Sequence, residues 1–239
     1  MTTSFEGLDR SNLHGHVVEV LARGRGGKAD LLVIEWRSQR AVLKDFAARA
    51  LPFRLTGWMQ INRELRAYRR LQGIPGVPRI YRRLDRYGFL MEEIHGRHLP
   101  RFRLRAIEQR RELLGQLGRI LDAAHAAGVI HNDARGRDNT LVSEEGRVYL
   151  VDFAGAVCLA PGSLLHALLF KRLASVDAAA FLKWKAIMLP EELSEQERRR
   201  LRRYGLLRRL WFFNPKGWGR FDAVTRAGRG TSEEETRDR

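Results

Sequence analysis

The order of strand and helix patterns in the first 94 residues constrains the fold more than any other feature of the chain. Three short apolar stretches typical of strands come first, each separated from the next by a few turn-forming residues, at 16–22, 31–36 and 40–46. A helical pattern follows, with apolar residues recurring at helical spacing: Ile61, Leu65, Tyr68 and Leu71. Two further strand patterns lie at 77–84 and 87–94. Connections this short join antiparallel neighbours, so we predict a small antiparallel sheet with one helix.

The pattern becomes helical after residue 95. A broad apolar stripe from Leu113 to Ala124 predicts a long helix. Two short strands are expected at 140–143 and 148–153, and nearly all of the chain after Ser163 has a helical pattern. The sequence therefore predicts an α+β protein of two lobes. The lobe at 13–94 contains the sheet, the lobe at 95–227 is mainly helical, and a disordered tail is expected at 228–239.

The chain is strongly basic. Its 239 residues carry 44 Lys+Arg against 28 Asp+Glu, a formal net charge of +16, and 44% of them are hydrophobic, which excludes a disordered chain. Such a charge favours anionic partners: nucleic acid, an anionic membrane surface or phosphorylated small molecules. The segment from Arg198 to Arg220 is basic and aromatic with no acidic residue. It fits either a solvated helix face or peripheral contact with an anionic membrane.

Cysteine usage and hydropathy predict a cytoplasmic protein. The single cysteine, Cys158, cannot form an internal disulfide, and the opening residues lack the apolar stretch of a secretory signal. No apolar run reaches the roughly 18 residues that a membrane span requires, and the run 158–170 is interrupted by Pro161 and Gly162. We therefore expect no membrane-spanning segment, and at most peripheral contact with the inner face of the cytoplasmic membrane.

Chemistry-bearing residues concentrate around the two predicted strands of the second lobe. The segment 131–139 reads His-Asn-Asp-Ala-Arg-Gly-Arg-Asp-Asn and precedes a strand-turn-strand pattern, after which 151–155 reads Val-Asp-Phe-Ala-Gly. Asp and Asn favour turns in any protein, but this joint spacing is far more specific than turn preference. Carboxylate and amide oxygens are hard ligands of the kind that Mg²⁺ prefers beside phosphate groups.

These two segments resemble the protein-kinase-like superfamily, and the resemblance implies a bilobal kinase-like fold and an ATP- and magnesium-dependent phosphotransferase. It implies that Asp133 orients the acceptor hydroxyl and that Asn139 and Asp152 bind magnesium. It also implies that Lys44, on the third strand, holds the α- and β-phosphates and is oriented by Glu64 on the following helix. A surface ion pair is the simpler alternative for those last two residues.

Two further parts of the nucleotide site follow from the same resemblance. The segment 92–96, with Glu92 and Ile94, is expected to be the interlobe hinge, whose backbone groups bind adenine. Three glycines of the first turn are candidates for a phosphate-covering loop: Gly24, Gly26 and Gly27. The spacing of a kinase glycine loop is incomplete there, and a plain hairpin turn explains these glycines equally well.

The departures from ordinary protein kinases are also informative. Asn132 stands where those enzymes have Arg, which argues against control by a phosphorylated activation loop. Only about nine residues separate Phe153 from the helix expected near Ser163, too few for a peptide-docking platform. Asn139 lies six residues after Asp133 instead of five, which leaves Asp138 as an alternative metal ligand.

This longer loop resembles that of the bacterial lipopolysaccharide core kinases, which phosphorylate Kdo or heptose sugars. The resemblance covers residues 14–226, including the Arg-rich, Trp-containing C-terminal helices, and implies an anionic sugar or glycolipid acceptor. Arg135, and next Arg137, are candidates for binding the γ-phosphate or that acceptor.

His131 is expected to support the loop by packing. Asp177 either braces the loop or caps a helix, and we leave it outside the predicted site.

Alternative functions share most of these residues. A RIO-like protein serine/threonine kinase or a small-molecule kinase of the aminoglycoside type would use the same metal and base side chains. From another class, a pseudokinase could bind a membrane or a partner through the basic C-terminal surface. Specific nucleic-acid binding is not expected, because no recognisable motif accompanies the charge.

Overall fold

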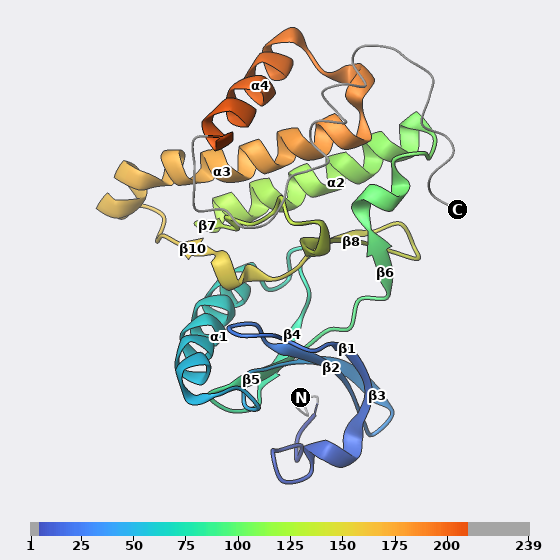
Figure 1. The fold of residues 1–239 in the computed structure, drawn as a ribbon, viewed down its shortest axis with the longest axis vertical. Coiled ribbons are helices and arrows are strands. Elements are labelled where there is room, and N and C mark those ends of the chain that lie inside the picture. Colours follow the sequence, from blue (N-terminus) through green and yellow to red (C-terminus); the bar gives the residue numbers. More distant parts are fainter. Residues whose placement is uncertain (1–4, 210–239) are drawn as a thin grey trace.

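The computed structural model describes residues 5–209 and shows an α+β fold with a small antiparallel sheet (Figure 1). Within those residues there are four α-helices, α1 packed beside the sheet and the other three in the C-terminal half. This arrangement is compatible with two lobes. Residues 210–239 lie outside the description, and the predicted tail at 228–239 is among them.

The sheet of the N-terminal lobe is antiparallel throughout, with strand order β1-β2-β3-β5-β4. Its strands are β1 (Val17–Ala22), β2 (Asp30–Trp36), β3 (Gln39–Asp45), β4 (Ile80–Arg83) and β5 (Gly88–Met91). The helix α1 (Leu51–Leu71) lies between β3 and β4 in the chain, so the predicted β-β-β-α-β-β order is confirmed. The strands predicted at 77–84 and 87–94 are shorter in the structure, where β4 covers Ile80–Arg83 and β5 covers Gly88–Met91. Residues 92–95 are not part of a strand.

The two faces of this sheet have different covers. The face that contains Phe89 packs against Ile61, Leu65 and Tyr68 of α1. The opposite face, with Leu43 and Leu90, is covered by residues 5–13 and the short 3₁₀ helix at Leu13–His16. The N-terminal segment therefore completes the lobe, although the sequence placed the start of the lobe at residue 13.

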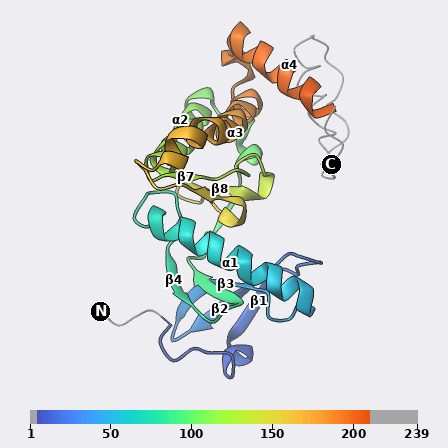
Figure 2. The same ribbon diagram turned by 90° about the vertical axis from the view of Figure 1, so that its left-hand side faces the viewer.

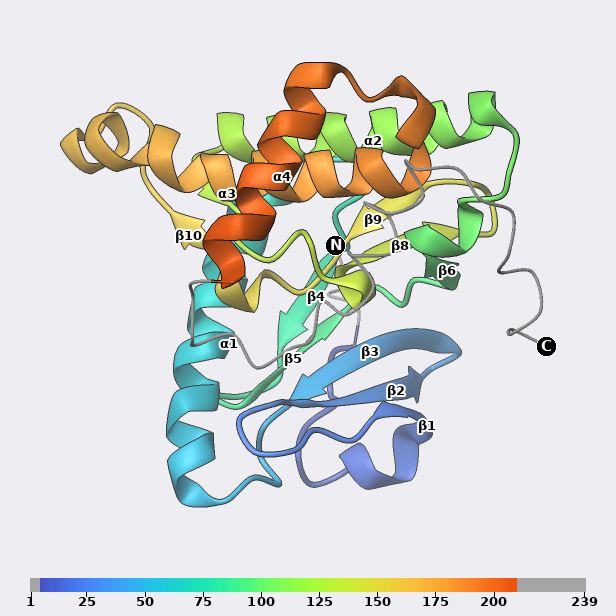
Figure 3. The same ribbon diagram turned by 45° about the horizontal axis from the view of Figure 1, so that its top comes forward.

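Long helices and small strand pairs form the C-terminal lobe. The helices are α2 (Ile107–Ala126), α3 (Leu164–Met188) and α4 (Glu195–Arg209). The strands are β6 (Gly96–His98), β8 (Thr140–Ser143) and β9 (Val148–Leu150) in one sheet and β7 (Val129–Ile130) with β10 (Val157–Cys158) in another. Short 3₁₀ turns lie at Leu99–Phe102, Arg137–Asn139, Phe153–Gly155 and Pro190–Glu192. In Figure 3 α2 and α3 lie above these strands, and α1 runs upright beside the five-stranded sheet of the N-terminal lobe.

Three expectations for this lobe need correction. The chain after residue 95 is not helical at once, because β6 and a 3₁₀ turn precede α2. The strand expected at 148–153 ends at Leu150, because Asp152 takes a left-handed backbone with φ of 64°. The pair β7 and β10 was not predicted, since two-residue strands carry no periodicity. The helix predicted within 198–220 is α4 up to Arg209, and its remainder lies outside the described residues.

One hydrophobic core joins the lobes. It contains Leu65 and Tyr68 of α1, Leu117 of α2, Trp184 of α3, and Phe153 of the turn after β9. The packing of α1 is tight where Gly57 faces Phe46, because a Cβ atom at position 57 would lie 2.4 Å from the Phe46 ring. Since Phe46 is fully buried, the ring cannot swing into solvent.

Two helical glycines should therefore respond oppositely to alanine. We expect Gly57→Ala to lower the free energy of unfolding by about 1–3 kcal/mol, because the added methyl overpacks the core. Gly115→Ala in α2 is the matched control: its Cβ would meet only the flexible end of Arg119 at 3.4 Å, and stability should rise by about 0.5–1 kcal/mol. Urea denaturation measures both. Equal effects of the two substitutions would contradict this packing.

Candidate functional site

The site is built around the side chain of Lys44. Leu43 points into the core on the outer face of the sheet, so strand alternation turns Lys44 to the opposite face, towards α1. There the Lys44 Nζ lies 2.7 Å from Glu64 Oε2 and 2.7 Å from Asp152 Oδ1. Glu64 shares the buried face of α1 with Ile61 and Tyr68. The structure thus brings together three predicted residues from β3, α1 and the turn after β9.

Burial and charge compete in this cluster. Burial alone would lower the pKa of Lys44, but the carboxylates of Glu64 and Asp152 outweigh it and hold that pKa above its ordinary value. Burial raises the pKa of Glu64, with a contribution from the nearby Asp152 charge that the Lys44 ammonium only partly offsets. Burial opposes ionisation of Asp152 as well, yet its ion pair with Lys44 keeps its pKa below the ordinary value. Lys44 is therefore a fixed positive charge and Asp152 a fixed negative one.

Asp133 and Asn139 form a second group beside the first. The Asn139 Nδ2 donates to the Asp133 backbone oxygen at 2.8 Å and to Asp133 Oδ2 at 3.2 Å. The two groups meet at the turn that follows Asp152, because the Asn132 side chain donates to the Gly155 carbonyl at 3.3 Å. A Cβ on Gly155 would also lie 3.9 Å from the Cβ of Asp133. The turn after Asp152 and the segment 131–139, which we call the catalytic loop after its predicted role, are thus neighbours.

The donor set at this junction fits a magnesium ion. Because its Nδ2 is turned to Asp133, the Asn139 Oδ1 remains as an acceptor, and one oxygen of Asp152 remains beyond the Lys44 contact. Both are hard oxygen ligands. Asp138 is the alternative ligand, but its side chain is 90% exposed and its ion-pair contact is with His98 Nε2 at 3.8 Å. Within the described residues no group of three or more His, Cys, Asp or Glu side chains is placed to hold a metal.

Helix α3 holds the catalytic loop in place from behind. The buried Asp177 accepts backbone N–H bonds from His131 and Asn132, both at 2.8 Å, and lies 3.0 Å from His125 Nε2. Trp184 Nε1 donates to the Ala134 carbonyl at 2.8 Å. Asn132 has a left-handed backbone with φ of 64°, a costly conformation that such anchoring sustains. Asp177 is thus a brace of the loop and not a helix cap.

Contacts between three rings connect α1 to the catalytic loop. Tyr68 packs on Phe153 at 5.0 Å between ring centroids, and Phe153 packs on His131 at 4.5 Å. His131 accepts the Asp133 N–H at Nδ1, so its Nε2 carries the hydrogen that faces the Val151 carbonyl. Burial lowers the pKa of His131, which agrees with a neutral ring. The expected supporting role of His131 matches this geometry.

The predicted glycine loop is the turn between β1 and β2. Gly24 donates its N–H to Asp30 at 2.7 Å, and its carbonyl accepts from Arg49 at 2.5 Å. A Cβ at Gly24 would lie 2.2 Å from the Lys28 carbonyl, and Gly26 has φ of +57°, so both positions favour glycine for the turn itself. Gln60 of α1 donates to Gly27. The turn is tied to α1, and phosphate binding by it stays a prediction.

The predicted hinge follows β5. The Glu92 backbone N–H donates to the Arg79 carbonyl at 2.8 Å, and the Glu92 side chain accepts from the Arg79 N–H at 2.9 Å. The backbone N–H and the carboxylate of Glu92 are therefore both hydrogen-bonded to Arg79, directly before β4. An adenine ring would have to use other backbone groups of this segment, including those of Ile94.

The arginines of the catalytic loop differ in their placement. Arg135 Nε lies 4.0 Å from Asp133 Oδ1, and its backbone carbonyl accepts from Lys183 at 2.7 Å. Arg137 is exposed in the 3₁₀ turn before β8. Of these two arginines, Arg135 is therefore the one held beside the carboxylate.

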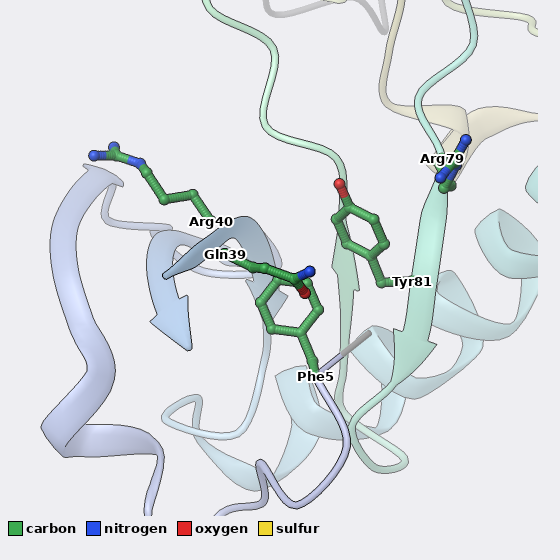
Figure 4. Close-up of a pocket in the computed structure, with 5 residues that line it drawn as sticks. All are labelled: Phe5, Gln39, Arg40, Arg79 and Tyr81. Atoms are coloured by element: carbon green, nitrogen blue, oxygen red, sulfur yellow. The ribbon is translucent and has the colours of Figure 1, made fainter. Parts of the chain in front are cut away.

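A separate pocket of about 310 Å³ opens on the outer side of the sheet (Figure 4). It is lined by Phe5, Gln39, Arg40, Arg79 and Tyr81. None of the predicted site residues lines it. Burial raises the pKa of Tyr81, with the Glu92 charge adding to the effect.

No family model matches this chain, and no curated protein matches it either. Across the part of the chain that the structure describes, no helix is both long and apolar enough to cross a bilayer. The site therefore has to be interpreted from its own geometry.

Sequence reasoning found the polar side chains of this site and the support by His131, but it left the role of Asp177 open and missed Trp184. Asp177 and Trp184 are seven residues apart, so they lie on one face of a helix, and this spacing was the available signal. Lys183 adds a contact that spacing alone does not indicate.

We expect Asp177→Asn to lower the free energy of unfolding by about 1.5–3 kcal/mol, because the new amide NH₂ faces a backbone N–H donor and the charged acceptor is lost. Asp122→Asn on exposed α2 surface is the matched control and should change stability by less than about 0.5 kcal/mol. Urea denaturation compares them. If both variants are as stable as the parent protein, Asp177 does not brace the loop.

Proposed function

We propose that this protein is an ATP- and magnesium-dependent phosphotransferase with a bilobal, protein-kinase-like fold. The observation that carries the proposal is the position of Lys44 between Glu64 and Asp152, beside the Asp133–Asn139 pair. A purely structural ion pair would explain Lys44 and Glu64, but it would not explain two further hydrogen-bonded polar side chains next to a strained, left-handed Asp152.

In the proposed reaction Lys44 pairs with the α- and β-phosphates of ATP while Glu64 keeps its ammonium in position. Asp152 and Asn139 would hold magnesium through side-chain oxygens. When bound, magnesium neutralises charge on the phosphate oxygens. The buried position of Glu64 and Lys44 fixes these charges before the substrate arrives, which is the condition for electrostatic catalysis.

In this proposal Asp133 binds the acceptor hydroxyl. Its side chain is 55% exposed, so a hydroxyl can reach it, while Asn139 fixes one of its oxygens. The acceptor oxygen forms a bond to the γ-phosphorus as the bond from that phosphorus to the β,γ-bridging oxygen breaks. ADP leaves with the bond electrons, and the hydroxyl proton passes to Asp133 and then to solvent. Arg135, whose Nε lies 4.0 Å from Asp133 Oδ1, would pair with the transferred phosphoryl group.

For the acceptor we propose a sugar hydroxyl of a lipopolysaccharide core or a related anionic glycolipid, reached at the inner face of the cytoplasmic membrane. In the connection between β5 and α2, two acidic residues, Glu92 and Glu93, are followed by residues 95–106, which carry four arginines and no acidic residue: Arg97, Arg101, Arg103 and Arg105. It runs beside the catalytic loop, where His98 meets Asp138. Only residues 154–163 separate Phe153 from α3, which leaves little chain to dock a peptide. Screening of sugar, protein and aminoglycoside acceptors with labelled ATP tests this choice.

Phosphotransfer should depend on the two carboxylates at the junction. With labelled ATP and magnesium we expect Asp133→Asn and Asp152→Ala each to reduce turnover about 10²–10⁴-fold while the protein stays folded. The control is Asp122→Asn, which changes the same charge on the exposed surface of α2 and should retain activity within about threefold of the parent protein. Undiminished transfer by both Asp133→Asn and Asp152→Ala would overturn the proposal.

A thermal-shift measurement separates an enzyme from a pseudokinase that lacks an ATP site. Saturating magnesium-ATP should raise the unfolding temperature, because a ligand at 100 times its Kd stabilises by about 2.7 kcal/mol. Magnesium omission should reduce that shift. The absence of any nucleotide-dependent stabilisation would favour the pseudokinase.

A further inference from the structure

The first turns of α3 carry leucines that the fold does not bury. Leu164, Leu165, Leu168 and Leu169, which we call the α3 tip, are 75%, 59%, 63% and 42% exposed. The first buried residue of α3 is Asp177, so the helix begins well outside the core. Figure 1 shows this end of α3 standing out beyond the rest of the lobe. Four exposed leucines on a protruding helix end indicate a contact surface.

The α3 tip is an ordered structure and not a frayed end. Ser163 caps the helix by accepting the His166 N–H at 3.1 Å. His166 stacks on Phe170 with centroids 4.3 Å apart, and Phe170 in turn meets His125 of α2 at 5.6 Å. These contacts hold the inner side of the helix, so the leucines stay on the outside.

Positive charge surrounds the α3 tip. Lys171 and Arg172 follow it on α3 and are exposed, and no acidic residue occurs in α3 before Asp177. The C-terminal end of α1 lies close by, because Arg70 donates to the Leu159 carbonyl at 3.0 Å. Exposed arginines follow the outer side of that part of α1: Arg63, Arg66 and Arg69. The only acidic residue of α1 is the buried Glu64.

A second apolar cluster lies on the other half of α1. Its members are 43–71% exposed: Leu51, Phe53, Leu55, Trp58 and Met59. Figure 2 shows α1 and the start of α3 on the same side of the molecule. This side therefore carries two apolar clusters with a row of arginines between them.

We propose that this side of the protein binds the surface of an anionic phospholipid bilayer, with the α3 tip inserted among the lipids. The leucines would enter the boundary between headgroups and acyl chains, and the arginines and lysine would pair with lipid phosphates. The tip is convex, which suits a deformable bilayer, whereas a protein partner would need a matching groove. A second copy of the chain would bring Lys171 and Arg172 against identical charges. This surface is different from the segment 198–220, and the inference does not require phosphotransfer.

Co-sedimentation with phosphatidylglycerol vesicles and with phosphatidylcholine vesicles tests the proposal. The full chain should bind the anionic vesicles, and the triple variant Leu164→Gln/Leu165→Gln/Leu168→Gln should bind them at least about tenfold more weakly, since it removes the inserted side chains. The pair Lys171→Gln/Arg172→Gln should also weaken binding about tenfold, because each charge contributes at an anionic surface. Neither variant touches the proposed catalytic residues, so magnesium-ATP stabilisation should persist in both.

Matched control variants substitute an exposed leucine and exposed arginines outside this surface. Leu104→Gln alters a leucine that is 88% exposed, and Arg37→Gln/Arg147→Gln removes two exposed charges from the turns between β2 and β3 and between β8 and β9. Both should bind anionic vesicles within about twofold of the parent chain. The proposal is overturned if the parent chain binds neither vesicle, if the tip variant binds like the parent, or if the controls lose binding equally. It is also overturned if the leucine substitutions abolish self-association in light scattering without changing vesicle binding.

Discussion

The contact of one ammonium group with two carboxylates is the interaction on which the rest of this structure depends. Lys44, Glu64 and Asp152 come from β3, α1 and the turn after β9; the side chains of Lys44 and Glu64 are buried, and that of Asp152 is half exposed. Removal of Lys44 would leave the buried Glu64 side chain facing Asp152 with no cation between them, which is destabilising in proteins. The sheet, the helix and the turn after β9 are therefore held in one arrangement by this contact.

Helix α1 transmits this arrangement between the lobes. Gln60, in the middle of α1, ties the helix to the first turn of the sheet, and Arg70, near its C-terminal end, ties it to Leu159 directly after β10. Between them, Tyr68 meets Phe153 edge-on, and Phe153 lies against His131. A movement of α1 would thus disturb the Lys44 cluster and the support of the catalytic loop together.

The sequence predicted the parts of this structure that have local signals. Short apolar stretches between turn residues predicted the β-β-β-α-β-β order along the chain, and the spacing of the segment 131–139 predicted the pair of Asp133 and Asn139 that the fold brings into contact. The two-residue strands β7 and β10 have no period to detect, and the 3₁₀ turn before α2 interrupts a segment that reads as helical. The role of Asp177 depends on where α3 packs, and the fixing of the first turn depends on Arg49, which lies 25 residues away from Gly24. Such tertiary contacts are not encoded in local pattern.

The most direct test of the central claim is a crystal structure with a non-hydrolysable ATP analogue and Mn²⁺ as an anomalous scatterer. The account predicts manganese bound by side-chain oxygens of Asp152 and Asn139, with Lys44 on the α- and β-phosphates and Asp133 facing the γ-phosphate. Nucleotide or metal bound away from these four side chains, in crystals where the lobes keep the arrangement described above, would contradict it.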